Sequence, residues 1–176
     1  MKEDVCTQLE SGALRFVRRL PGPIDRVWSY VIDPAKRRLW FAGGTMGEEA
    51  GDEFTWDFDL EALADQEVPE RFPEMSGGVR TRARVLEIDP PNLLVVIGIE
   101  DPQEIRFELH EEGDEVEFVL IQGPPPEFDD LISTAAGWQA CLGLLIDHLH
   151  GQAPRSFWAE HETAEGIYGE RFSADG

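Results

Sequence analysis

The sequence predicts an α+β fold in which an antiparallel sheet of six or seven strands curves around a long C-terminal helix, with two short helices after the first strand. Residues 129–151 indicate the long helix, because apolar side chains recur there at alternating steps of four and three residues and so share one face. Segments of strand character between residues 53 and 121 indicate the sheet. The residues on the helix face are Leu131, Ala135, Trp138, Leu142, Leu145 and Leu149. A sheet wrapped around a helix usually leaves a cavity, where we look for function.

The elements before the sheet are indicated by prolines and a capping residue. A first strand is expected over residues 14–20. Pro23 is well placed in the first turn of a helix. Asp33 then caps a second helix that has Pro34 at its first position and is expected to extend over residues 35–41, ending before a pair of glycines.

Period-two alternation predicts the remaining strands. Apolar residues alternate with polar ones in most of these segments, as expected for antiparallel strands with one solvated face. The segments are 53–60, 79–88, 93–99, 104–110 and 115–121. Residues 89–92 and 111–114 read as hairpin connections. A further strand is expected near residues 45–49, paired with the segment that begins at residue 53.

One domain accounts for most of the chain. We assign it to residues 12–151, preceded by a polar segment, residues 1–11, that is expected to be frayed. Residues 61–78 are acidic and contain two prolines, which favours an extended loop or lid with a short helix at 61–66. The tail, residues 152–176, holds more aromatic residues than disordered chains do, so part of it is expected to pack on the domain.

Charge and cysteine content exclude several classes of function. The chain has 15 Lys and Arg against 36 Asp and Glu, a net charge of -21, which disfavours binding to nucleic acid or to an anionic membrane surface. Cys6 and Cys141 form no metal-binding motif, so we expect free thiols in a reducing cytoplasm. No signal peptide or membrane span is expected either.

Three separated motifs resemble one known family. They are VRRLPGPIDRVWSYVIDPAKRRLWFAGG (17–44), VLEIDPPNLLVV (85–96) and GWQACLGLLIDHLHG (137–151). In this order they resemble the homologues of the heat-shock-protein-90 ATPase activator that are similar to its C-terminal domain, within the START-like or SRPBCC superfamily. The resemblance implies the helix-grip fold, also called Bet v 1-like, and a hydrophobic ligand cavity. It does not imply a particular ligand.

An aromatic-rich set supplies the candidate ligand pocket. Its members are expected to line an apolar pocket beneath the long helix; the alternative is that they fill the core, since aromatic side chains dominate packing. The candidate pocket residues are Trp40, Phe41, Phe54, Trp56, Phe58, Trp138, Leu142 and Leu145. No catalytic residue, metal ligand or cofactor site is expected.

Two glycines and three arginines each allow two interpretations. Gly137 and Gly143 lie inside the helix, where glycine costs about 1 kcal/mol relative to alanine. Close packing explains them better than space left for a ligand. Arg80, Arg82 and Arg84 form either a cationic stripe for an anionic ligand or a solvated face paired with Glu and Asp, and we favour the second.

The histidines and one acidic pair are weaker candidates. An acid–base or metal role for His110, His148, His150 and His161 is less favoured than an ordinary structural role. Glu100 and Asp101 end a strand and are candidates for the cavity mouth.

Three functions are compatible with these features. The first is a non-enzymatic protein that binds a small apolar molecule, such as a fatty acid, a polyketide-like compound or an aromatic compound. The second is a protein-interaction or chaperone-cofactor module, in which the negative charge steers a basic partner. The third is a cavity-based enzyme such as a cyclase, dehydratase or hydrolase. Exposed strand edges would also allow a homodimer.

Overall fold

The computed structural model describes residues 5–59, 63, 70 and 78–175. The acidic segment 61–78, for which we predicted a loop or lid with a short helix at 61–66, lies outside the described residues except for Leu63, Glu70 and Gly78.

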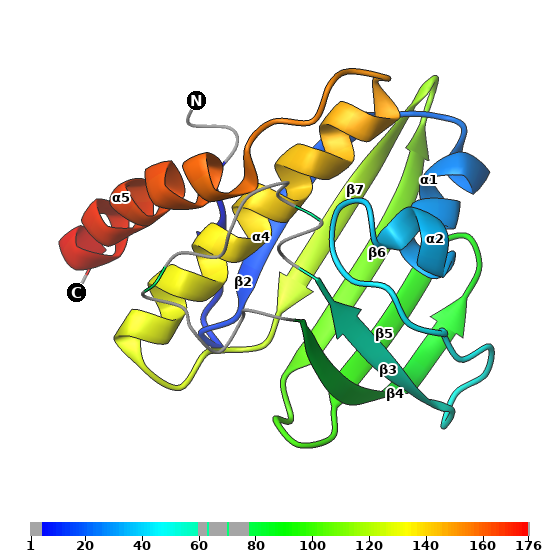
Figure 1. The fold of residues 1–176 in the computed structure, drawn as a ribbon, viewed down its shortest axis with the longest axis horizontal. Helices are drawn as coiled ribbons and strands as arrows, with labels where there is room; N and C mark the ends of the chain where they lie inside the picture. Colours follow the sequence, from blue (N-terminus) through cyan, green and yellow to red (C-terminus); the bar gives the residue numbers. More distant parts are fainter. Residues whose placement is uncertain (1–4, 60–62, 64–69, 71–77, 176) are drawn as a thin grey trace.

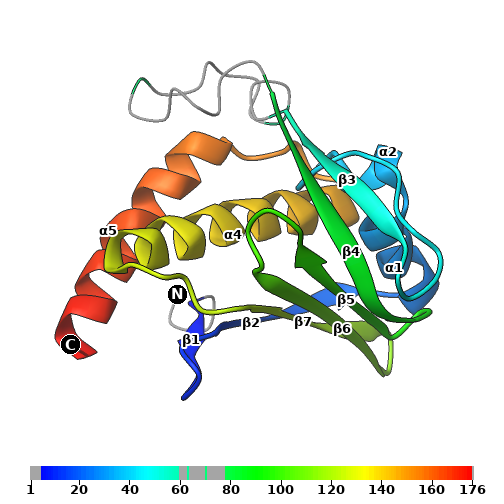
Figure 2. The same cartoon turned by 90° about the horizontal axis from the view of Figure 1, so that it is seen from below.

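A seven-stranded antiparallel sheet forms the main layer, as predicted. The two hairpin connections at 89–92 and 111–114 are confirmed, since each joins two neighbouring strands. In spatial order the strands are β1 (Thr7–Gln8), β2 (Leu14–Pro21), β7 (Glu115–Gln122), β6 (Glu104–Glu112), β5 (Leu93–Gly98), β4 (Val79–Asp89) and β3 (Glu53–Phe58). The sheet curves, and β4 and β3 bend toward the side that carries the long helix (Figure 2).

In the part of the chain that the structure describes, four helices cover the concave side and one end of the sheet (Figure 1). They are α1 (Ile24–Ile32), α2 (Pro34–Arg37), α4 (Phe128–Leu149) and α5 (Phe157–Asp175). The long helix α4 lies across the sheet, and α5 packs along α4 on the side away from the sheet (Figure 2). The arrangement confirms the predicted sheet gripping a C-terminal helix and adds a second helical layer.

Both faces of α4 are buried. The predicted face packs toward the sheet, and all six of its residues are buried. Ala136, Ala140 and Leu144 lie off that face and are also inaccessible. Because α5 covers the side of α4 away from the sheet, the helix needs small or apolar residues on most of its circumference.

The second helix is shorter than predicted. The expected helix over 35–41 ends as α2 at Arg37, and the chain continues to Phe41 in turns. Asp33 caps it as expected, accepting a hydrogen bond from the Ala35 amide at 2.9 Å. Neighbouring residues on a helix point about 100° apart. Because the chain after Arg37 is in turns and not in a helix, Trp40 and Phe41 can both be buried.

The predicted strand at 45–49 is wrong. Only a single bridge, between Gly43 and Asp57, joins this part of the chain to β3. Beyond it the Asp52 carboxylate accepts hydrogen bonds from the amides of Glu48 and Glu49, each at 3.0 Å. These amides are therefore used in a local turn instead of a strand ladder.

The expectation that residues 1–11 are frayed is wrong for residues 5–11. Thr7 and Gln8 pair with β2, and Cys6 is buried. The Cys6 amide donates to the Tyr168 hydroxyl at 2.9 Å, and that hydroxyl donates to Gln139 of α4 at 2.7 Å. A tyrosine of α5 thus joins the N-terminal segment to the long helix.

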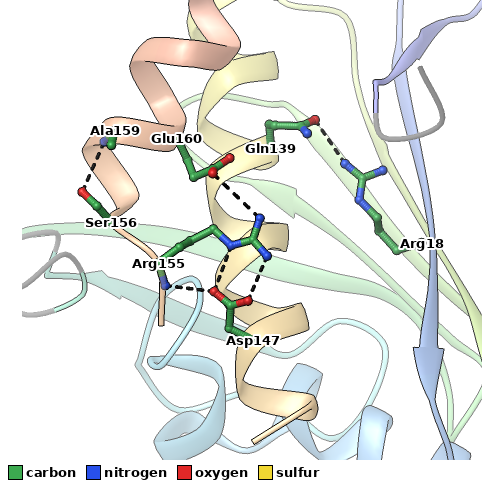
Figure 3. A network of polar contacts seen from close by, with 7 residues as sticks. All are labelled: Arg18, Gln139, Asp147, Arg155, Ser156, Ala159 and Glu160. Carbon is green, nitrogen blue, oxygen red and sulfur yellow. Dashed lines mark hydrogen bonds and ion pairs between the residues drawn. The ribbon is translucent and has the colours of Figure 1, made fainter. Parts of the chain in front are cut away.

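An ion pair fixes the start of α5 against α4. The carboxylate of Asp147 on α4 accepts hydrogen bonds from the amide, Nε and Nη2 of Arg155 at 2.9, 2.9 and 2.8 Å (Figure 3). Arg155 lies against Gly143, where an added Cβ would come within 2.9 Å of the Arg155 Cδ. Gly143 is therefore explained by close packing, as we favoured, although the neighbour is Arg155 and not the sheet.

Asp147→Asn is expected to lower the free energy of unfolding at pH 7 by about 1–3 kcal/mol, because it removes a charge-assisted pair from a buried position. Arg155 lowers the pKa of Asp147 below its ordinary value of 3.8. The contribution is therefore complete above that value and is lost as the pH falls through the lower pKa of the folded state. Urea unfolding of both proteins between pH 7 and pH 2 measures the difference.

Glu160→Gln is the matched control for this experiment. Glu160 lies 3.9 Å from the Arg155 guanidinium and is partly exposed, so its removal is expected to change stability by less than about 0.5 kcal/mol. Equal effects of the two substitutions would contradict the role assigned to Asp147.

Candidate functional site

A cavity with two connected lobes lies between the sheet and α4. One lobe, about 440 Å³, faces β4, β5 and β6; the other, about 1010 Å³, extends along α4 to α5. Seven described residues line both lobes: Phe41, Phe58, Asp101, Ile105, Gln122, Asp130 and Thr134. The space is of the size that small-molecule sites have.

Phe41 is the centre of the aromatic wall. Its ring centroid lies 4.6 Å from that of Trp138, 5.0 Å from that of Trp56 and 5.1 Å from that of Phe58. These four residues come from α4, β3 and the chain that follows α2. Phe41 meets Trp56 and Phe58 edge to face, which aromatic rings favour, and its contact with Trp138 is tilted.

Arg37 holds the segment that carries Phe41. This arginine is fully buried, and its guanidinium lies 4.9 Å from the Trp56 ring. It donates hydrogen bonds to the backbone carbonyls of Val31, Ile32, Ala42, Gly43 and Gly44. Burial lowers its pKa to about 10, although nearby Asp33 and Asp57 act in the opposite direction. The guanidinium thus replaces a backbone ladder in holding residues 42–44.

The turn after Phe41 requires glycine at position 44. Gly44 has a φ of +97°, and a Cβ there would collide with the carbonyl oxygen of Thr55. The chain consequently passes close to β3 and places Phe41 over the concave face.

The structure divides the eight predicted pocket residues. Phe41, Trp56, Phe58 and Trp138 line the cavity. Trp40, Leu142 and Leu145 are fully inaccessible and fill the core instead. Phe54 borders a different depression, beside the loop that follows Gly44. Whether the four wall residues bind a ligand stays a prediction.

The placement of Trp40 has a clear cause. Its indole N–H donates to the Tyr30 carbonyl at 2.8 Å, and its ring packs against Phe107 and Phe118 of the sheet. A buried tryptophan needs a partner for its N–H. The α1 carbonyl satisfies that need, which directs the side chain away from the cavity.

Gly137 leaves open space on the cavity wall. It lines the larger lobe, and a Cβ built there would meet no atom within 4 Å. We favoured close packing at this position, and that interpretation is wrong. The missing side chain adds to the volume of the cavity.

The three arginines of β4 form the solvated face that we favoured. Each pairs with an acidic residue at 2.6–2.7 Å, and every partner is partly or largely exposed. The pairs are Arg80 with Asp57, Arg82 with Glu100, and Arg84 with Glu53. Glu100 and Asp101 both line the smaller lobe.

The sequence reading missed the wall that α5 supplies. Phe157, Trp158, His161 and Glu165 line the larger lobe, together with Cys141 of α4. His161 is buried, and its Nδ1 lies 3.0 Å from the Glu165 carboxylate. The spacing of four residues between them was a usable signal, since such residues meet on one helix face.

The charges on the cavity wall are mainly negative. Asp101, Asp129 and Asp130 border the larger lobe, and Glu165 lies beside His161. Burial raises the pKa of the Cys141 thiol to about 12, so this cysteine stays protonated and is a poor nucleophile at neutral pH. The chemistry available is hydrogen bonding, aromatic contact and proton exchange at His161.

Neither a metal centre nor a membrane span is seen in residues 5–59 and 78–175. No group of three or more His, Cys, Asp or Glu side chains there could hold a metal ion. No helix in the same ranges is long and apolar enough to cross a membrane.

A curved antiparallel sheet around a long helix, with a cavity between them, defines the helix-grip class of α+β proteins. Within it, the chain belongs to the family described as activator of Hsp90 ATPase homolog 1-like protein, whose model matches residues 21–150. None of the curated proteins compared with the chain matches it.

Solved structures agree with this fold. A Bordetella parapertussis protein is 35% identical, with a TM-score of 0.81 over 94% of this chain and 88% of the other. CalU16 from Micromonospora echinospora is 19% identical, with a TM-score of 0.66 over 94% and 93%. The protein NE0264 from Nitrosomonas europaea is 14% identical, with a TM-score of 0.63 over 81% and 97%. The last two show similarity of fold alone.

Proposed function

We propose that this protein binds a small, largely apolar, ring-containing molecule in the cavity between the sheet and α4, without transforming it. The observation that carries the proposal is the aromatic wall around Phe41, which is open to a cavity of about 1010 Å³. A space of this size, lined by aromatic rings together with polar and acidic side chains, suits a small-molecule ligand.

The rigidity of the wall supports binding further. Trp138 is held by a hydrogen bond to Gln122 at 2.9 Å, and the Phe41 segment is held by Arg37. Rings that are already fixed lose little conformational freedom when a ligand arrives. The acidic side chains on the wall of the larger lobe favour neutral or cationic ligands over fatty acids, whose carboxylates they repel.

Native mass spectrometry of protein purified gently from its own cells tests the proposal. The expected result is a stoichiometric adduct that is released by denaturation and identified after extraction. An adduct-free mass, together with no thermal shift from a library of neutral aromatic compounds, would overturn it.

A cavity-based enzyme is the second candidate, and one observation favours it. The buried His161 lines the larger lobe and has a carboxylate partner, Glu165, within 3.0 Å. A carboxylate beside a histidine orients the ring and stabilises its protonated form, which is how acid–base catalysts are commonly built.

The fate of the bound molecule separates the two candidates. The protein is incubated with the extracted compound, which is then analysed by mass spectrometry. A binding protein returns it unchanged. An enzyme converts it, and His161→Asn is then expected to abolish the conversion while the compound still binds.

A further inference from the structure

Gln122 lies where the two lobes of the cavity meet. It is the last residue of β7, it lines both lobes, and it is only 7% exposed. Glutamine is seldom this buried unless its amide has partners. On the shared wall Phe41, Phe58 and Ile105 offer no side-chain hydrogen bonds, and none of the hydrogen bonds among the described residues joins Gln122 to Asp101, Asp130 or Thr134.

Trp138 determines which way the Gln122 amide points. The indole N–H can only donate, and it lies 2.9 Å from Oε1 of Gln122. The oxygen end of the amide is therefore directed at Trp138, and the NH₂ end is directed elsewhere. The single hydrogen bond that Nε2 makes in the structure is to the Gly123 carbonyl at 3.5 Å, the outer limit for such a bond.

At least one N–H of Gln122 therefore has no acceptor among the residues that the structure describes. A buried donor without a partner destabilises the folded state unless a water or a ligand supplies one. A ligand oxygen at the junction of the lobes would satisfy it, while the rings of Phe41 and Trp138 contact the body of the molecule.

We propose that Gln122 is the residue that sets ligand specificity, by donating a hydrogen bond from Nε2 to a neutral carbonyl oxygen of a ring-containing ligand. The inference rests on the function proposed above and narrows its ligand class. The carbonyl is neutral because Asp101 and Asp130 border both lobes and repel a carboxylate.

Three matched compounds test the proposal: fluorenone, fluorene, which lacks the carbonyl oxygen, and fluorene carboxylate. Binding to the intact protein is followed by quenching of tryptophan fluorescence. Fluorenone is expected to bind about threefold to tenfold more tightly than fluorene, which is the contribution of one net hydrogen bond. The carboxylate is expected to bind most weakly of the three.

Gln122→Met keeps the side-chain length and removes both N–H donors. The variant also lacks the Oε1 that accepts from the Trp138 indole, so both compounds are expected to bind it more weakly than the wild type, but with equal affinity. The infrared carbonyl band of bound fluorenone should lie at lower frequency in the wild type than in the variant. Detectable fluorene binding also shows that the variant is folded. The ratio of the fluorenone and fluorene affinities is measured on the wild-type protein as well, and that comparison does not depend on the variant.

The outcomes separate the two proposals. Equal binding of fluorenone and fluorene to the wild type overturns the role of Gln122 and leaves the binding function standing. If the carboxylate binds most tightly of the three, the proposal that Gln122 donates to a neutral oxygen is overturned. If none of the three compounds binds, the inference about Gln122 fails, whereas the proposed function is decided by the native mass spectrometry described above.

Discussion

Arg37→Met is expected to lower the free energy of unfolding by about 3–5 kcal/mol, the largest effect of any single substitution considered. The guanidinium donates to five backbone carbonyls and is fully buried. Methionine fills similar space but donates to none of those carbonyls, of which the Gly43 carbonyl keeps the Asp57 amide as a donor at 3.1 Å. Part of this loss of stability is offset, because the variant no longer buries a charged guanidinium, whose desolvation lowers the pKa of Arg37. Urea unfolding followed by circular dichroism measures the change.

Arg38→Met is the control for Arg37. Arg38 is the next residue and is exposed, so the same substitution there is expected to change stability by less than about 0.5 kcal/mol. Similar stabilities for the two variants would show that the carbonyls of residues 42–44 do not depend on Arg37. A folded Arg37→Met variant should also bind fluorene more weakly, since Phe41 loses its support.

Gly137→Leu is expected to weaken fluorene binding by at least about tenfold without loss of stability, because the new side chain occupies the larger lobe. The site has room for it, since a Cβ at position 137 meets nothing within 4 Å. Removing a glycine from a helix interior is itself stabilising by roughly 0.5–1 kcal/mol. Fluorescence titration and thermal unfolding of the same samples measure both effects.

Gly166→Leu is the control that distinguishes the effect of filling the cavity from the effect of a higher helix propensity. Gly166 lies in α5, is exposed, and also has no atom within 4 Å of a built Cβ. It should gain similar helix stability and bind fluorene like the wild type. Unchanged fluorene binding by Gly137→Leu would place the ligand outside the cavity.

Most of the fold could be predicted because hydrophobic periodicity reports local geometry directly. The six residues with helical spacing from Leu131 to Leu149 are all buried on α4, and the alternating segments form the strands of one sheet. The errors came where tertiary contacts override local pattern. Residues 45–49 have strand character, yet the Asp52 carboxylate holds them in a turn.

The candidate site could be predicted only in part. Phe41, Trp56, Phe58 and Trp138 line the cavity, whereas Trp40 does not, although it is adjacent to Phe41 and of the same character. The partner of the Trp40 indole N–H decides this difference, and that partner is a carbonyl ten residues away on α1. An aromatic residue in a sequence predicts burial, but it does not show whether the side chain packs against other protein atoms or faces a cavity.

The sequence by itself determined the class of fold, the faces of its strands and long helix, and the acidic character of the surface. These follow from the order and spacing of side chains along the chain. Tertiary structure alone decided that α5 closes the larger lobe with His161 and Trp158, and that Trp138 directs the Gln122 amide. Such contacts join residues from different elements, and their geometry depends on how whole elements pack and not on local periodicity.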